Sequence, residues 1–441
     1  MAREFKDSGI EWIGHIPKEW EVKKVKYVSD AINKGNGITK EEVFADGDTP
    51  CVRYGEIYSK YNTSFDNCLS ATRIEIQKSP RYFYKGDILF AGTGELVEEI
   101  GKNIVYFGEK PCLAGGDIII LSHHQSPSFL NYALNCHSSQ AQKSRNKAKL
   151  KVVHISASEI GDILIALPSL PIQKKIADYL DKVCGEVDEM VALQETMIEE
   201  LKAYKQSVIT EAVTKGLNPN TPMRNSGIDW IGDIPEHWKL EPLKYCFGRR
   251  SEKNNPVKTE ERLSLSIDKG VTLYSEKTTN LDRFKEDFTQ YQLAYPNDIV
   301  LNCMNMIVGA VGLSNYMGCV SPVYYVIYPI RQDINPLYYS YLLNIPTIRG
   351  VYYSLGKGIY AIERGEGRVN TCRLKVAYND FGRLDIPVPP IEEQKEITLY
   401  IQQKCSEIDS LIALKQAKIE ELKEYKKSVI YEYVTGKKEV V

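Results

Sequence analysis

The segment IEELKAYKQSVITEAVT occupies residues 198–214, and the chain repeats it as IEELKEYKKSVIYEYVT at residues 419–435. The similarity extends without a gap over residues 160–214 and 381–435, at an offset of 221. A chain of 441 residues that repeats itself at this distance consists of two similar halves. The repeat therefore predicts an internal duplication with pseudo-twofold symmetry.

A second repeated segment lies near the start of each half. SGIEWIGHIPKEW at residues 8–20 returns as SGIDWIGDIPEHW at residues 226–238, and all four tryptophans of the chain lie in these copies. We call them the first and second tryptophan segments. Residues 30–140 and 250–360, between the repeated parts, share little sequence. This pattern suggests a common scaffold that carries two different recognition domains.

The repeated tails have the apolar spacing of coiled-coil helices. From Ile176 to Val208, apolar residues alternate at spacings of four and three and include Met190 and Met197, with a break at Gln194. Val191 and its equivalents in the second tail widen the stripe on one side. Helices of about 40 residues would be roughly 60 Å long. The residues that we predict to hold the spacer helices together or to bind partners are Leu180, Val187, Leu201, Tyr204, Ile401, Ile408, Leu422 and Tyr425.

Two arrangements of these helices fit the sequence. Each helix could be a separate arm that pairs with another chain. Alternatively, the two helices could pair with each other, and a pseudo-twofold axis would then make them antiparallel. We favour the second arrangement, an antiparallel coiled coil that holds the two recognition domains at a fixed distance.

The divergent middles read as mixed α/β domains. DIIILS (117–122), VYYVIY (323–328) and GDILFAG (86–92) are typical of strands bounded by turns. Residues 129–144 and 341–354 have the apolar face of a helix. The sequence therefore predicts a mixed α/β (α+β) chain with a recognition domain at 1–165, a helical spacer at 166–217, a second recognition domain at 218–385 and a C-terminal helical spacer at 386–441.

A basic stretch precedes each helical tail. Such a stretch can be a solvated loop, but lysine and arginine also neutralise phosphates, and arginine can bind guanine through two hydrogen bonds. The repeated position in a duplicated chain favours contact with DNA. The candidate DNA-binding residues are Lys143, Arg145, Lys147 and Lys149 in the first stretch and Lys357, Arg364, Arg368 and Arg373 in the second.

Composition and charge limit the classes of protein to which this chain can belong. Charged residues make up 26% of the chain and are mixed in sign, as in globular proteins, and the net charge is −2. A nucleic-acid-binding protein that acts alone is more often basic, so partners would have to supply further phosphate contacts. The start of the chain has no apolar signal core, and no run of 18 apolar residues follows. We expect a cytoplasmic protein without membrane contact.

Catalytic and metal-binding motifs are weak in this sequence. The ten cysteines include no C-x-x-C pair, and the six histidines have no ligand spacing. FAGTG (90–94) matches a glycine motif of methyltransferases that bind S-adenosylmethionine. An adenine methyltransferase would also need an N/D-P-P-Y/F segment, which the sequence lacks. We therefore expect no catalytic residue, no metal site and no cofactor.

Taken together, these segments resemble the specificity subunit of type I restriction–modification systems. The resemblance rests on the two tryptophan segments and on IPVPPIEEQKEI (386–397), which leads into the long second tail. The first copy of that proline motif, IALPSLPIQKKI (165–176), keeps Pro168 and Gln173 but has Ile172 where the second copy has Glu393. This difference puts equal contacts at the two helix starts in doubt.

The resemblance implies a non-catalytic subunit with two target-recognition domains, each of which reads half of a bipartite, asymmetric site in double-stranded DNA. The helical tails would set the gap and dock two methyltransferase (modification) subunits, and motor–endonuclease (restriction) subunits would join that complex. Methylation and cleavage would belong to the partners. Two other readings stay open: a coiled-coil interaction scaffold that does not read DNA, and a methyltransferase acting alone.

Overall fold

The structure is a computed structural model that describes residues 3–145, 147, 152–267, 269–276, 287–359, 363–364, 368–369 and 373–440. The chain forms two compact units. Unit 1 comprises Met1–Glu195 and Gln416–Val441, and unit 2 comprises Thr196–Lys415. Each unit therefore contains one recognition domain and a part of each long helix. Within the described ranges, no helix is long and apolar enough to cross a membrane.

Unit 1 is built on a five-stranded sheet that packs against a four-stranded sheet. The first sheet has the order β4 (Ser29–Lys34), β13 (Ile118–His123), β9 (Ile88–Ala91), β11 (Asn103–Tyr106) and β6 (Ser64–Phe65). The second has the order β7 (Ser70–Thr72), β5 (Thr49–Val52), β12 (Cys112–Ala114) and β8 (Tyr82–Phe83). The short pairs are β1 (Phe5–Asp7) with β2 (His15–Pro17), β3 (Glu21–Lys24) with β15 (Leu164–Leu167), and β10 (Thr93–Gly94) with β14 (Val153–His154). The helices are α1 (Tyr54–Ser59), α2 (Pro127–Asn135), α3 (His137–Ser144) and α4 (Ala157–Gly161), with 3-10 turns η1 (Val25–Tyr27), η2 (Ile74–Ile76) and η3 (Val97–Glu99).

Unit 2 is built on a four-stranded sheet with the order β19 (Phe247–Arg250), β26 (Tyr324–Pro329), β23 (Ile299–Asn302) and β24 (Val311–Leu313). Its short antiparallel pairs are β16 (Met223–Asn225) with β17 (Asp233–Pro235), β18 (Lys239–Pro242) with β31 (Asp385–Val388), β20 (Leu263–Ser266) with β21 (Gly270–Leu273), β22 (Gln292–Ala294) with β25 (Gly318–Val320), β27 (Lys357–Ile359) with β30 (Arg373–Lys375), and β28 (Glu363–Arg364) with β29 (Arg368–Val369). The helices are α6 (Pro336–Leu342), α7 (Pro346–Leu355) and α8 (Tyr378–Gly382), with 3-10 turns η4 (Leu243–Tyr245), η5 (Tyr274–Glu276), η6 (Phe288–Gln290) and η7 (Met306–Val308).

The two units share a central sheet that sequence comparison did not find. In chain order and in pairing, β4, β13, β9 and β11 of unit 1 correspond to β19, β26, β23 and β24 of unit 2. Unit 1 adds β6 at one edge and a second sheet of four strands, whereas the strands outside the sheet of unit 2 form separate pairs. Buried apolar side chains tolerate exchange when size and pattern are kept, so the topology survives where sequence similarity does not.

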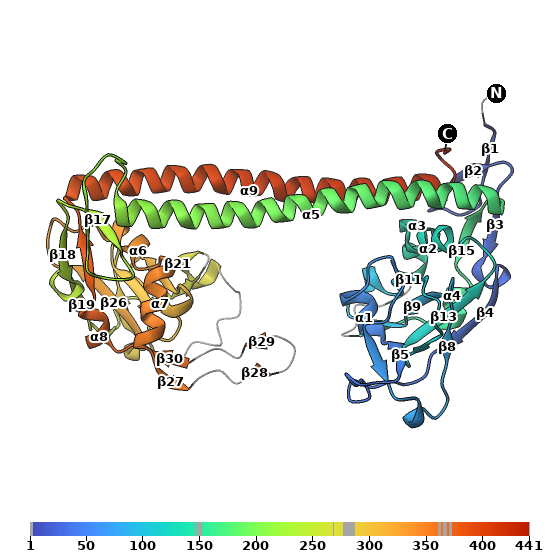
Figure 1. Cartoon of the computed structure of the whole chain (residues 1–441), viewed down its shortest axis with the longest axis horizontal. Coiled ribbons are helices and arrows are strands. Elements are labelled where there is room, and N and C mark those ends of the chain that lie inside the picture. Colours follow the sequence, from blue (N-terminus) through green and yellow to red (C-terminus); the bar gives the residue numbers. More distant parts are fainter. Residues whose placement is uncertain are drawn as a thin grey trace. The chain divides into compact units, whose positions relative to one another are not determined.

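The long helices are α5 (Leu170–Lys215) and α9 (Ile391–Val434), of 46 and 44 residues. Within each unit, their segments lie side by side and run in opposite directions (Figure 1). In unit 1, the Lys426 ammonium pairs with Asp188 at 2.7 Å. In unit 2, Lys205 pairs with Asp409, also at 2.7 Å. Positions 205 and 426, like 188 and 409, differ by the 221 of the sequence repeat, so the pairing confirms the predicted antiparallel coiled coil.

Two positions of the predicted heptad seam in each long helix are displaced by one residue. Met190 and Tyr204, which we assigned to the seam, are 50% and 56% exposed. The inward positions are instead Val191, Ile198 and Lys205. The same correction applies in α9, where Leu411 and Tyr425 are exposed. The prediction was wrong because a polar residue, Lys205, occupies an inward position while apolar residues occupy outward ones. The other assigned positions are buried or partly buried: Leu180, Val187, Leu201, Ile401, Ile408 and Leu422.

Two predicted helices are each broken into two. The segment predicted as one helix at 129–144 forms α2 and α3, which are separated by Cys136 in an extended conformation. The segment at 341–354 breaks between α6 and α7, where Ile345 is extended before Pro346. The ring of a proline clashes with a helical conformation of the preceding residue, which explains the second break. The strands predicted at 86–92, 117–122 and 323–328 are confirmed as β9, β13 and β26.

Each tryptophan segment receives the C-terminal end of a long helix. Gly216, just after α5, packs on the second segment, and a Cβ at this residue would lie 3.4 Å from the Trp238 ring. Gly436, just after α9, packs on the first, and a Cβ there would lie 2.5 Å from Pro17. Both glycines have positive φ, as is usual where a helix ends. The tryptophan segments are thus seats for the helix ends.

A buried glutamine fixes the start of each long helix against the recognition domain. The Gln173 side chain accepts a hydrogen bond from the Ser126 N–H at 3.1 Å and donates one to the Pro168 carbonyl. Gln394 forms the same pair of bonds in unit 2, with the Asn335 N–H at 2.8 Å and the Pro389 carbonyl. These bonds satisfy a backbone N–H at the start of α2 and of α6. At this position, the two helix starts make equal contacts.

Candidate nucleic-acid interface

The first basic stretch contains a lysine that is inside the protein. The Lys143 side chain is buried, and its ammonium donates hydrogen bonds to the Gly101 carbonyl at 2.7 Å and to Asn103 Oδ1 at 2.9 Å. Burial lowers the pKa of Lys143 to about 7. The prediction that Lys143 contacts DNA is therefore wrong, because its ammonium is enclosed and bonded to the Gly101 carbonyl and to Asn103 in β11. An alternation of lysines with small residues gave no sign of this burial.

The remaining residues of this stretch differ in exposure. Arg145 is exposed, and its guanidinium lies 5.7 Å from the centroid of the Trp12 ring. Lys147 is largely covered, with its ammonium bonded to the His154 carbonyl and to Glu159, each at 2.7 Å. Lys149 lies outside the described residues. Of the described cations in this stretch, Arg145 is thus the one that the fold presents to solvent.

The second basic stretch forms paired strands. Lys357 begins β27, is exposed, and lies 3.7 Å from an Asp380 carboxylate oxygen. Arg364 is in β28, Arg368 in β29 and Arg373 in β30, and the side chains of these three arginines lie outside the described part of the chain. Lys375, at the end of β30, is exposed. The sequence suggested a loop for this stretch, whereas its described residues pair as strands, β27 with β30 and β28 with β29.

An arginine that we did not select from the sequence lies beside this second stretch. The Arg249 guanidinium, at the end of β19, is 5.0 Å from the centroid of the Tyr325 ring and 4.9 Å from that of Tyr378. Arg249 is exposed, and no carboxylate lies within 4.0 Å of it among the described residues. The Tyr325 hydroxyl donates to the buried Val376 carbonyl at 2.8 Å, which fixes that ring. Arg249 and Arg250 are adjacent in the sequence, and nothing there indicated which of them faces solvent.

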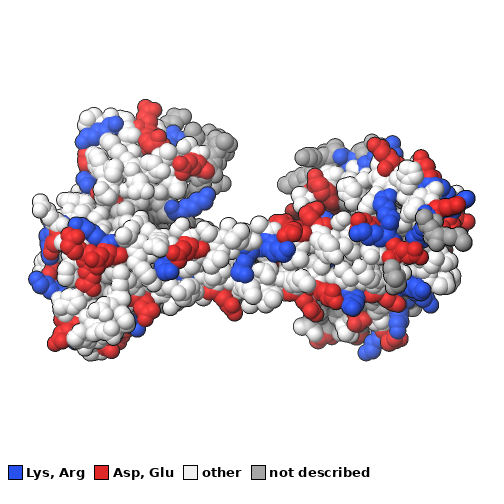
Figure 2. Space-filling model, turned by 90° about the horizontal axis from the view of Figure 1, so that it is seen from above, with Lys and Arg blue, Asp and Glu red and all other residues white. Residues whose placement is uncertain are grey.

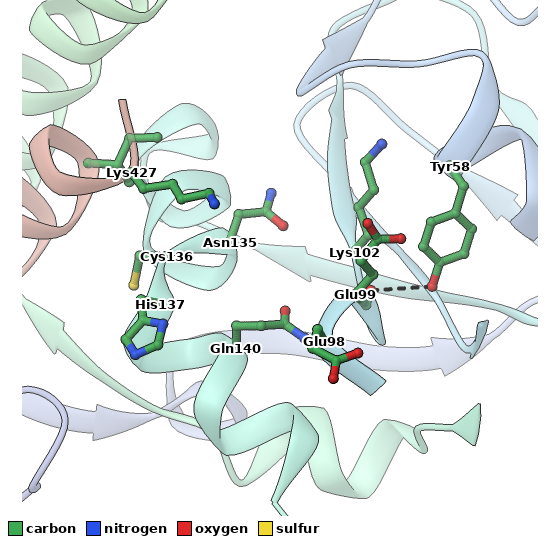
Figure 3. A pocket seen from close by; sticks show the side chains of 10 residues that line it. Tyr58, Glu98, Glu99, Lys102, Asn135, Cys136, His137, Gln140 and Lys427 are labelled. Carbon is green, nitrogen blue, oxygen red and sulfur yellow. Dashed lines mark hydrogen bonds between the residues drawn. The ribbon is translucent and has the colours of Figure 1, made fainter. Parts of the chain in front are cut away.

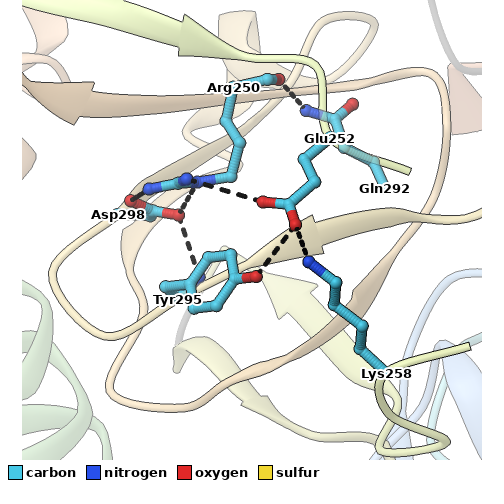
Figure 4. A network of polar contacts seen from close by, with 6 residues as sticks. All are labelled: Arg250, Glu252, Lys258, Gln292, Tyr295 and Asp298. Atoms are coloured by element: carbon cyan, nitrogen blue, oxygen red, sulfur yellow. Dashed lines mark hydrogen bonds and ion pairs between the residues drawn. The ribbon is translucent and has the colours of Figure 1, made fainter. Parts of the chain in front are cut away.

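Its neighbour Arg250 is partly buried and is held by a polar network (Figure 4). The Arg250 guanidinium donates two hydrogen bonds to Asp298, at 2.7 and 3.0 Å, and lies over the Tyr295 ring. Its main-chain carbonyl accepts a hydrogen bond from Gln292. The bonds to Asp298 raise the pKa of Arg250. The sheet pleat sends adjacent side chains to opposite faces, so β19 carries one internally paired arginine and one exposed arginine.

One cavity of unit 1 was a place to look for a catalytic grouping among the described side chains. A cavity of about 450 Å³ in unit 1 is lined by side chains that include Tyr58, Lys102 and His137 (Figure 3). Its Tyr58 hydroxyl donates to the Glu99 carbonyl, and its Cys136 thiol donates to the Ala133 carbonyl. Neither forms a nucleophile–base pair of the kind that covalent catalysis needs. Within the described ranges, no cluster of three or more His, Cys, Asp or Glu could hold a metal ion. On the face drawn in Figure 2, acidic and basic side chains are intermingled.

Comparison with known proteins gives the family. The family model described as the type I restriction modification DNA specificity domain matches residues 17–203. A putative type I restriction enzyme MjaX specificity subunit from Methanocaldococcus jannaschii is 25% identical, with 96% of this chain and 95% of that protein covered. The EcoBI specificity subunit from Escherichia coli is 25% identical over 66% of this chain and 59% of its own length. The chain is thus similar to type I restriction specificity subunits over most of its length. The family resemblance predicted from the sequence is therefore confirmed.

Solved structures of such subunits have the same fold. One, from work on complex assembly and conformational transition of the type I R-M system, has a TM-score of 0.67 at 15% identity and covers 95% of this chain and 98% of its own. The HsdS subunit from Thermoanaerobacter tengcongensis has a TM-score of 0.51 at 15% identity, with 96% and 98% covered. These structures confirm the predicted fold class of two mixed α/β domains joined by two long helices. The relatives are named for specificity, which agrees with the prediction of a non-catalytic subunit.

Proposed function

We propose that this chain is the DNA sequence-recognition subunit of a type I restriction–modification complex. In this proposal, each recognition domain reads one half of a bipartite site in double-stranded DNA. The observation that carries it is the combination of equal mounts with unequal domains. Both units have the same central strand order, the same helix seats and the same glutamine contacts, but the strands around the central sheet differ. Two unequal readers on one scaffold require an asymmetric target.

The helices supply a second part of the proposal, the docking of two methyltransferase subunits. Some outward positions of the coiled coil carry large apolar side chains. These positions are related by the sequence repeat, so units 1 and 2 each have a set of them. Met190 and Leu193 in α5 are 50% and 53% exposed, and their equivalents in α9, Leu411 and Leu414, are 47% and 67% exposed. Exposed apolar side chains of this size at repeated positions suit partner helices. Their duplication supports two copies of one partner, and restriction subunits would join the resulting complex.

The DNA-binding residues that we propose follow from exposure. Arg145 in unit 1 and Lys357 in unit 2 are exposed and belong to the two basic stretches. Arg364, Arg368, Arg373 and Lys149 remain candidates from the sequence. We also propose that the paired helices set the gap between the half-sites and that the protein acts in the cytoplasm, where it has access to the DNA of its host.

The test is to sequence modified bases in DNA from cells that carry this gene together with its neighbouring methyltransferase gene, and from cells that lack this gene alone. Methyladenine at a gapped, asymmetric site, present only with this chain, is the expected result. A continuous or palindromic methylated site would contradict two unequal readers. If the helices bind the methyltransferase subunit while methylation does not depend on this chain, the protein is an interaction scaffold.

A further inference from the structure

We propose that Arg249 binds a phosphate of the DNA backbone in the half-site read by unit 2. This inference rests on the proposed function and adds to it a residue that lies outside both basic stretches. Its basis is a contrast between two adjacent arginines on one strand. Arg250 is neutralised by Asp298 inside the domain, whereas Arg249 has aromatic rings and no carboxylate as neighbours among the described residues.

The position of Arg249 in its strand determines where its side chain points. Phe247 is buried in the core of unit 2, and Arg249, two residues later, leaves the same face of the sheet at its end. Arg249 is opposite Ile327 in the sheet register, and Tyr325 is the diagonal neighbour on β26. Diagonal neighbours lie close enough for long side chains to reach an aromatic ring. The sheet therefore brings the guanidinium to the rim of the core.

Two tyrosine rings, Tyr325 and Tyr378, hold the Arg249 guanidinium. Tyr378 packs edge-on against Tyr325, with ring centroids 5.4 Å apart, and also contacts Phe381. The Tyr325 hydroxyl is bonded to the Val376 carbonyl, which fixes that ring, and Tyr378 packs against it. A guanidinium held against aromatic faces keeps its N–H groups available at its edge. Stacking thus reduces the rotamer freedom that binding would otherwise remove.

The charges of Arg249 and Lys375 favour an anion as the ligand. Lys375, at the end of β30, is exposed. Burial raises the pKa of the Cys303 thiol, and the nearby charges of Lys375 and Arg249 both oppose that rise. Among the described residues, neither cation has a carboxylate within 4.0 Å, so both add positive charge beside the aromatic rings. A planar guanidinium beside a lysine matches the oxygens of a phosphate. The strand of unit 1 that corresponds to β19 is β4, and its residues 30–33 are Asp, Ala, Ile and Asn. None of these is an arginine, so the proposed contact belongs to one half-site.

The experiment measures DNA binding by the full chain in complex with its methyltransferase subunits. The variants are Arg249→Gln, Arg249→Lys and, as a control for a surface charge elsewhere in unit 2, Lys395→Gln, whose lysine is paired with Glu392. Three duplexes are compared: the methylated gapped target, the same target with the second half-site scrambled, and one with both half-sites scrambled. Affinity is measured between about 50 and 200 mM salt, where phosphate contacts dominate the salt dependence.

For a phosphate contact, Arg249→Gln should weaken binding roughly tenfold at low salt on all three duplexes and lower the salt slope by about 1. Arg249→Lys should keep most of the salt slope, and Lys395→Gln should match the unaltered protein. A loss confined to duplexes with an intact second half-site would overturn the phosphate assignment in favour of base contact. An unchanged affinity would overturn any DNA contact by Arg249. If the unaltered complex itself does not bind the duplexes, the proposed function fails instead.

Discussion

Glu393 accepts a hydrogen bond from the indole Nε1 of Trp238 at 3.0 Å, and the first unit has no equivalent of this bond. Ile172 stands where the repeat would place the carboxylate, and Trp20 Nε1 is buried without a hydrogen-bond partner among the described residues. Glu393 also contacts His237 Nε2 at 2.9 Å. The difference between the two proline motifs thus has a defined structural effect on the two helix starts.

This asymmetry predicts unequal effects of one substitution in the two units. Trp20→Phe and Trp238→Phe remove the same volume, but only Trp238→Phe removes a hydrogen bond to a carboxylate. We expect the second substitution to cost about 1–2 kcal/mol more. Hydrogen exchange of each unit provides the measurement, because the free energy of opening can be read separately in units 1 and 2. Equal losses in the two units would show that the Glu393 bond contributes nothing to stability.

The two buried glutamines should both be sensitive to loss of their polar atoms. Gln173→Leu and Gln394→Leu each leave a backbone N–H and a carbonyl buried without partners. The expected cost is about 1–3 kcal/mol for each unsatisfied group, in the unit that carries the change. Gln402→Leu, at an exposed position of α9, is the control and should be close to neutral. Thermal unfolding of the three variants is the measurement, and a cost for Gln402→Leu as large as for Gln394→Leu would contradict the clamp.

Buried Lys143 predicts that unit 1 becomes more stable as pH rises. The folded pKa of Lys143 is about 7, below the ordinary value of 10.5, so between these values the unfolded chain binds more protons than the folded one. The contribution of Lys143 to the stability of unit 1 should therefore be lowest below pH 7 and should increase from about pH 7 towards pH 10. Lys143→Met should remove this part of the pH dependence. Exposed Lys182, changed to Met, should leave it intact, and urea unfolding at several pH values would distinguish the two variants.

The repeated ion pairs of the coiled coil predict a charge-swap effect. Lys205→Asp places two acids together in unit 2 and should cost about 1 kcal/mol, and adding Asp409→Lys should restore most of that loss. The same pair of changes at Lys426 and Asp188 should act on unit 1. A double-mutant cycle at low and high salt measures the coupling. A double variant no better than Lys205→Asp alone would mean that the paired charges do not determine helix alignment.

The proposed spacing role of the helices predicts a change in target length. Inserting seven residues at matched points of α5 and α9 keeps the heptad register and lengthens each helix by about 10 Å. The gap between half-sites should grow by about three base pairs at 3.4 Å per base pair, while both half-site sequences stay the same. Methylation sequencing reads the gap and the half-sites together. New half-site sequences with an unchanged gap would refute the spacing role.

Sequence reasoning succeeded where one strong pattern determined the structure. The repeat and the heptads predicted two units and two long antiparallel helices. The displaced seam shows the limit of such patterns, because Lys205 is inward and Met190 outward, and the ion pair with Asp409 became visible only with the partner helix in place. For the same reason the common strand order of the divergent middles could not be predicted, since their pairing depends on residues far apart in the chain.

The candidate DNA interface was predicted less well. Lys143 and Arg145 are two residues apart and look alike in the sequence, yet one is enclosed by the Gly101 carbonyl and Asn103 and the other is exposed. Likewise, nothing local distinguishes Arg249 from Arg250. Burial of a charged side chain depends on partners elsewhere in the fold, here Asp298 for one arginine and two tyrosine rings for the other.

The contacts of the two helix ends with the tryptophan segments determine the order in which the two units can finish folding during translation. The second tryptophan segment receives the end of α5, which the ribosome has already made, and unit 2 is complete once Lys415 has emerged. The first tryptophan segment has to wait for Gly436, which is translated long after it. Unit 1, whose residues are mostly synthesised first, is thus the last to finish folding. A nascent chain stopped before Gln416 would leave the seat at Pro17 and Trp20 open, so unit 1 can close only after unit 2 has been translated.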